Sequence, residues 1–160
     1  LRDLHSHQFH DGLGFVVIMF TSILLTDVGC YYAGTKFGKH KLAPVISPNK
    51  TIEGSVGGII CAILGALVIG YFIPGLQWYL TVMAALFCTV FAQIGDLCES
   101  MVKRDAGVKD SGDIIPGHGG FLDRCDSYIL AIPVMYYYCN YFICSNDLLN
   151  NLSMFFKGLF

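Results

Sequence analysis

Four long apolar stretches constrain the fold of this chain most strongly. They cover residues 13–33, 55–73, 78–95 and 127–144, and each approaches the roughly 20 residues that a helix needs to cross a bilayer. Charged residues make up only 14% of the sequence, whereas an ordinary soluble domain contains about 25%. The sequence therefore predicts an all-α, polytopic integral membrane protein with about four transmembrane helices, forming a single membrane domain over residues 1–160.

The distribution of basic residues predicts the orientation of these helices. The turn at residues 74–77 joins the second and third stretches into an antiparallel pair, so loops 34–54 and 96–126 share one membrane face. These two loops contain eight of the ten Lys and Arg residues, and basic loops tend to stay on the cytoplasmic side. We therefore expect both polar loops on the cytoplasmic face, or on the equivalent stromal or matrix face.

Net charge and residue types exclude some functions. The formal net charge of −2 argues against a nucleic-acid partner, because such proteins usually carry a basic excess. The seven cysteines form no CxxC pair and lie mostly in apolar stretches, which indicates buried free thiols. Small residues recur along the second stretch, which predicts close packing against another helix.

Carboxylates concentrate in loop 96–126. If the third helix continues into this loop, one of its faces carries four polar residues: Asp96, Glu99, Ser100 and Lys103. Asp123 and Asp126 stand three residues apart where the fourth stretch begins. Carboxylates at two helix ends can hold Mg²⁺, which prefers a few carboxylates together with phosphate oxygens and water.

Basic residues and glycines lie between these carboxylates. Arg104 directly follows Lys103, and such side chains neutralise phosphate charge. The rest of the loop adds further polar residues: Lys109, Asp110, His118, Gly119, Gly120 and Arg124. Successive glycine amides can cradle an anion. The loop therefore predicts a site for a phosphorylated ligand at the membrane surface.

A second polar group precedes this loop in the sequence. Asp27 lies in the C-terminal part of the first stretch, and an acidic residue inside a membrane helix is a functional hypothesis by default. Residues 44–58 follow, with a turn expected at Ser47 and Pro48. Beyond it come candidate ligands for phosphate or base and an acidic residue near the start of the second stretch: Asn49, Lys50, Thr51 and Glu53.

These two groups of residues resemble the signature of the phosphatidate cytidylyltransferases, also called CDP-diacylglycerol synthases. In the second loop the matching positions are Ser100, Lys103, Arg104, Lys109, Asp110, Gly112, Ile115, Pro116, His118, Gly119, Gly120, Phe121, Asp123, Arg124 and Asp126. Residues 47–54 are similar to the family's S-P-x-K-T-x-E-G, and the stretch before them matches at Asp27, Tyr31, Gly34, Phe37 and Gly38. Cys125 stands where the family usually has a larger aliphatic residue. The resemblance covers about residues 22–144.

The resemblance implies that CTP and phosphatidate react to give CDP-diacylglycerol and pyrophosphate. It implies Mg²⁺ as cofactor, leaving a second cation open, and a homodimer in a bacterial inner membrane or an organellar membrane. It also implies further helices upstream, so this chain is expected to be the C-terminal catalytic part of a longer enzyme.

The same resemblance implies roles for individual residues. The metal ligands are Asp96, Asp123 and Asp126. The catalytic residues are Lys103, Arg104, Lys109, Asp110, His118 and Arg124. The residues that bind substrate are Asp27, Ser47, Asn49, Lys50, Thr51, Glu53, Ser100, Gly119 and Gly120.

Two alternatives remain from the residues alone. A related membrane enzyme could use CTP to phosphorylate a polyprenol or to cytidylylate an archaeal lipid. A channel or transporter could use Asp27 as a residue of its ion pathway. The polar residues gather at one end of the predicted spans and do not run through them, which favours the enzyme.

Overall fold

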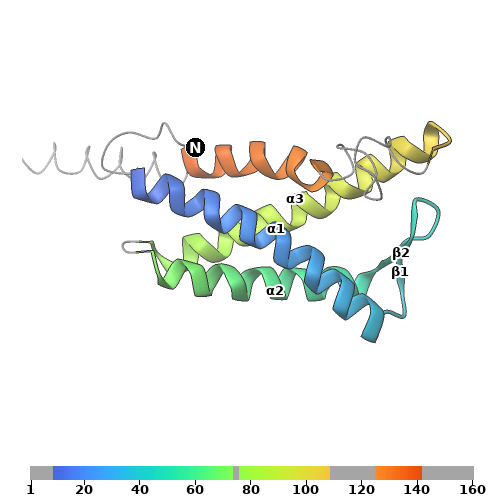
Figure 1. The fold of residues 1–160 in the computed structure, drawn as a ribbon, viewed down its shortest axis with the longest axis horizontal. Coiled ribbons are helices and arrows are strands. Elements are labelled where there is room, and N and C mark those ends of the chain that lie inside the picture. The colour runs from blue at the N-terminus through green and yellow to red at the C-terminus, as the bar shows by residue number, and fades with distance from the viewer. Residues whose placement is uncertain (1–8, 74–75, 109–124, 142–160) are drawn as a thin grey trace, which may run out of the picture.

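A computed structural model describes residues 9–73, 76–108 and 125–141, and the remaining residues lie outside the described part (Figure 1). The elements in chain order are α1 (Phe9–Phe37), β1 (Lys41–Ala43), β2 (Ser47–Thr51), α2 (Ile52–Tyr71), α3 (Trp78–Asp105) and a further helix over residues 125–141. The chain is mostly helical, which confirms the predicted all-α class, with one short β-hairpin added.

Three helices in the described ranges are long and apolar enough to cross a membrane: Gly12–Phe37, Ile52–Tyr71 and Trp78–Asp105. α1 and α3 both extend beyond the apolar stretches that predicted them. The extension of α3 to Asp105 confirms that Asp96 and Lys103 lie on one continuous helix. The fourth predicted span is helical over residues 125–141, and its last three residues, 142–144, lie outside the described part.

Glycines bring α1 and α2 into close contact. A Cβ atom placed on Gly58 of α2 would lie 2.8 Å from the carbonyl oxygen of Thr26 and 2.5 Å from the Sγ of Cys30. On α1, a Cβ atom at Gly29 would lie 2.9 Å from the carbonyl oxygen of Gly57. The predicted close helix packing is therefore confirmed, because no larger residue fits between these backbones.

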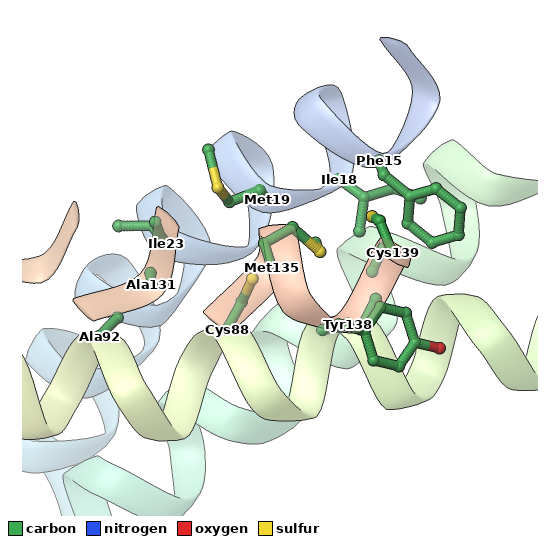
Figure 2. Close-up of a cluster of buried hydrophobic side chains, with 13 residues drawn as sticks. Phe15, Ile18, Met19, Ile23, Cys88, Ala92, Ala131, Met135, Tyr138 and Cys139 are labelled. Carbon is green, nitrogen blue, oxygen red and sulfur yellow. The ribbon is translucent and has the colours of Figure 1, made fainter. Parts of the chain in front are cut away.

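The buried core joins α1, α3 and the helix over 125–141 (Figure 2), and α2 contributes Ala66 to it. The Phe15 ring of α1 meets the Tyr138 ring edge-on, with 6.1 Å between their centroids. The Tyr138 hydroxyl donates a hydrogen bond to the carbonyl of Leu80 at 2.8 Å, which satisfies a polar group that would be costly to leave unpaired in an apolar core. By contrast, one face of α2 is exposed along its length at Val56, Ile60, Leu64 and Val68.

The segment between α1 and α2 is an antiparallel hairpin, in which Lys41 pairs with Thr51 and Ala43 with Ser47. The prediction that Ser47 and Pro48 form a turn is wrong. The chain reverses at residues 44–46, and Pro48 lies inside β2. The two strands form a sheet by themselves, so each is an edge strand, where a proline without an N–H is tolerated.

Candidate active site

The hairpin and the C-terminal ends of α1 and α3 lie at one end of the helix bundle, and the α2–α3 connection lies at the other (Figure 1). The hairpin and the C-terminal end of α3, which are described parts of the two predicted polar regions, therefore lie at the same end. A cavity of about 310 Å³ opens there. Its lining includes six of the predicted site residues: Asp27, Ser47, Asn49, Lys50, Thr51 and Asp96.

The central contact in this pocket joins the hairpin to α3. The Lys50 ammonium on β2 forms an ion pair with the Asp96 carboxylate on α3. Both side chains are about a quarter to a third exposed, at 26% and 31%. The pair brings together one residue predicted to bind substrate and one predicted to bind metal, although they are distant in the sequence.

Thr51 connects the hairpin to the start of α2. Its Oγ1 accepts a hydrogen bond from the Gly54 N–H at 3.1 Å, so it is the N-cap of α2. Such a cap satisfies one of the free N–H groups at a helix start. Thr51 also lines the pocket, and its hydroxyl proton is not used by the cap.

Glu53 stabilises the base of the hairpin. Its carboxylate accepts hydrogen bonds from the backbone N–H groups of Lys39 and His40, at 3.1 and 3.2 Å. The Nδ1 of His40 lies 2.6 Å from the same carboxylate. Glu53 is not among the residues that line the pocket. The structure therefore gives the predicted substrate ligand Glu53 an anchoring position outside the pocket.

The other predicted residues of α3 lie beyond the pocket. Lys103 donates to the Glu99 carboxylate at 2.9 Å, one helical turn away. The Nε of Arg104 donates to the carbonyl of Ile46 at 3.3 Å, at the turn of the hairpin. Ser100 is partly buried on the same helix. Arg104 thus holds the hairpin against α3, which the sequence did not indicate.

Carboxylates gather around Asp96. Asp27 and Asp126 both lie close enough to interact electrostatically with it, and Asp126 also interacts with Glu99. In the residues that the structure describes, no group of three or more His, Cys, Asp or Glu side chains is arranged to hold a metal ion. The predicted ligand Asp123 lies outside the described residues, as do Lys109, Asp110, His118, Gly119, Gly120 and Arg124.

Other pocket residues were missed from the sequence. Gln93 of α3 and Ser55 of α2 face each other across the pocket, where the Ser55 hydroxyl donates to the Gln93 side-chain oxygen. The Gln93 amide also donates to the Ser55 carbonyl at 3.3 Å. The position of Gln93 could have been predicted, because its polar amide lies in an apolar stretch one helical turn before Asp96. The remaining lining residues are Cys30, Leu42 and Ser127, together with Tyr31 and Gly54, which belong to the motifs matched in the sequence.

Comparison with known proteins supports the resemblance found in the sequence. Residues 2–142 match the model of the cytidylyltransferase family. The chain is 48% identical over 126 residues to a phosphatidate cytidylyltransferase of Staphylococcus haemolyticus, which covers 78% of this chain and 48% of the relative. The corresponding proteins of Staphylococcus epidermidis and Staphylococcus aureus are 49% and 47% identical over the same length, with the same coverage.

The chain spans about half the length of the curated relatives it matches. The family model nevertheless covers nearly all of the chain, including every described residue of the pocket. The chain therefore belongs to the cytidylyltransferase family.

Proposed function

We propose that this chain forms the C-terminal catalytic part of an enzyme that transfers the cytidylyl group of CTP to phosphatidate, giving CDP-diacylglycerol and pyrophosphate. The observation that carries this proposal is the pocket in which Lys50, Asp96 and neutral donors of the hairpin meet at the ends of membrane helices. The staphylococcal relatives named phosphatidate cytidylyltransferase support the choice of reaction.

The position of the pocket suits a soluble and a lipid substrate together. It lies at the end of helices long and apolar enough to span a membrane, so a nucleotide from the water phase and a lipid headgroup can reach the same place. We propose a multi-pass protein with this end on the cytoplasmic, stromal or matrix side. Eight of the ten basic residues belong to sequence segments 34–54 and 96–126, and basic loops tend to stay on that side.

The chemistry requires positioning and charge compensation more than a strong base. The phosphate monoester of phosphatidate attacks the α-phosphorus of CTP, and pyrophosphate leaves. Such a monoester is already largely ionised near neutral pH, because its second pKa is about 6. Lys50, Asn49 and Ser47 line the pocket, and we propose that they bind phosphate oxygens. Fixed charges of this kind stabilise the transition state without reorganising during the reaction.

We propose that the pocket holds a magnesium ion, which needs only one or two protein carboxylates beside phosphate oxygens and water. Asp96 supplies a hard carboxylate oxygen in the pocket. This carboxylate already binds one positive charge, the Lys50 ammonium. Asp126 lies beside it. We propose that Asp96, Asp123 and Asp126 hold Mg²⁺, with a second cation left open. When bound, the ion offsets negative charge on the triphosphate.

The decisive assay is conversion of labelled CTP and phosphatidate to CDP-diacylglycerol in detergent micelles with Mg²⁺. Asp96→Asn is expected to remove product formation while the protein stays folded. Asp105→Asn, the same change at an exposed position of the same helix outside the pocket, should keep it. Because the relatives are about twice as long as the match, the assay is also run on the corresponding full-length protein. Normal turnover by the full-length protein with the substitution that corresponds to Asp96→Asn would contradict the proposal.

The same preparation tests the lipid acceptor and the assembly. A panel containing phosphatidate, a polyprenol and an archaeal lipid should give product with phosphatidate alone. We also propose a homodimer, and the protein mass in the detergent complex, measured by light scattering, should equal two chains. Product from the polyprenol instead, or a mass of one chain, would contradict the respective proposal.

A further inference from the structure

The ammonium group of Lys50 is buried and has more hydrogen-bond donors than partners. Its Nζ atom is inaccessible to solvent, and the residues that the structure describes offer it no partner beyond the Asp96 carboxylate. A lysine ammonium has three donors, and burying a charge is costly unless it is well paired. One carboxylate leaves donors of this group without a partner among the described residues, and Lys50 lines a pocket of about 310 Å³.

Contacts at the base and at the turn hold the hairpin that carries Lys50. At its base, the Ile52 N–H donates to the carbonyl of His40 at 3.0 Å, and Glu53 binds the N–H groups that follow α1. At its turn, Arg104 of α3 binds the Ile46 carbonyl. The backbone is therefore held, whereas the four-carbon side chain can rotate. Lys50 can move its charge within the pocket without moving the hairpin.

The charges around Asp96 determine where the Lys50 ammonium binds. Asp27 and Asp126 both interact electrostatically with Asp96, so the carboxylates repel one another when no cation is present. The Lys50 ammonium offsets this repulsion. A divalent cation at Asp96 would compete with Lys50 for the same oxygens, and a phosphate ligand would offer Lys50 new partners.

We propose that Lys50 is an exchange residue, whose ammonium holds the Asp96 carboxylate in the absence of nucleotide and moves to ligand phosphate when a divalent cation takes Asp96. The identity of the ligand rests on the proposed function; the competition at Asp96 does not. The exchange makes cation and nucleotide binding depend on each other through one side chain.

The proposal predicts effects of opposite sign on two ligands. Lys50→Gln should strengthen the binding of Mg²⁺ alone by about tenfold, within the usual range of coupling between sites, because the competing ammonium is gone. The same variant should weaken binding of CTP in the presence of EDTA, because a phosphate-binding group is lost. Lys50→Arg keeps the charge and should leave the Mg²⁺ affinity within about threefold of wild type, a difference below 1 kcal/mol.

Isothermal titration calorimetry of the detergent-solubilised protein measures both affinities. Lys41→Gln is the matched control, because it removes the same charge from the same hairpin at an exposed residue outside the pocket. Tighter Mg²⁺ binding and weaker CTP binding in Lys50→Gln alone support the exchange. Unchanged or weaker Mg²⁺ binding, unchanged CTP binding, or an equal gain in Lys41→Gln would overturn it.

A second variant covers the case in which Lys50→Gln does not fold. Asp96→Asn frees the ammonium, so it should bind CTP more tightly than wild type in EDTA, whereas Asp105→Asn should not. No gain over Asp105→Asn would overturn the exchange. Turnover by the corresponding full-length protein tests the proposed reaction separately: its absence there contradicts the reaction, while the Mg²⁺ titration still decides the competition at Asp96.

Discussion

Substituting Gly58 with alanine tests the close approach of α1 and α2 that supports one wall of the pocket. The new Cβ atom would lie 2.8 Å from the Thr26 carbonyl oxygen and 2.5 Å from the Cys30 Sγ. The sulfur can rotate away, but the carbonyl belongs to the backbone of α1, so the helices must separate. Cys30 and Asp27, next to these contacts, line the pocket.

Two opposing terms decide the size of the effect. Overpacking a well-packed interface costs about 1–3 kcal/mol, and replacing glycine by alanine inside a helix returns about 0.5–1 kcal/mol. We expect a net loss of about 1–2 kcal/mol, since the obstructing atom is backbone. At about 2–4 °C per kcal/mol for a protein of this size, the melting temperature should fall by several degrees.

The measurement is thermal unfolding in detergent, followed by circular dichroism, together with turnover. Gly14→Ala is the matched control, because its Cβ atom would meet only side-chain atoms of Ile73, at 3.1 and 3.2 Å, which can adjust. It should leave the melting temperature unchanged or raise it. A Gly58→Ala protein as stable and as active as wild type would refute the inferred backbone contact.

Three further predictions concern the hairpin, the polar pair and the metal. Glu53→Gln should loosen the hairpin by weakening its bonds to Lys39 and His40, seen as faster protease cleavage at residues 44–46; an unchanged cleavage rate would rule out the anchoring role. Gln93→Leu removes the pocket amide and should raise the KM of a substrate more than it lowers kcat, whereas a changed kcat at constant KM would contradict a binding role. Chelation with EDTA should stop turnover and excess Mg²⁺ should restore it; full activity in EDTA would contradict the metal proposal.

Much of the fold could be predicted because it depends on local patterns. The apolar stretches predicted the helices, and the polar residues after Gly95 still form helix because nothing in that segment breaks it before Gly107, where φ is positive at 69°. The signature residues also predicted which part of the chain carries the chemistry. The family match over residues 2–142 confirms the predicted family.

The roles of individual side chains could not be predicted in the same way. Glu53 and Lys50 belong to one short motif, yet one anchors the hairpin outside the pocket and the other pairs with Asp96 inside it. Arg104 reaches back to the Ile46 carbonyl, and Gln93 pairs with Ser55. Each of these contacts joins residues that are many positions apart in the sequence.

The sequence by itself thus determined the helical membrane class, the family and the chain segments that form the site. Hydropathy and motif spacing are properties of neighbouring residues, so they can be recognised without knowing the folded structure. Only the tertiary structure decided which charges meet, because Lys50 on the hairpin and Asp96 on α3 come together only in the folded chain. That meeting depends on packing distances in three dimensions, which no local pattern encodes.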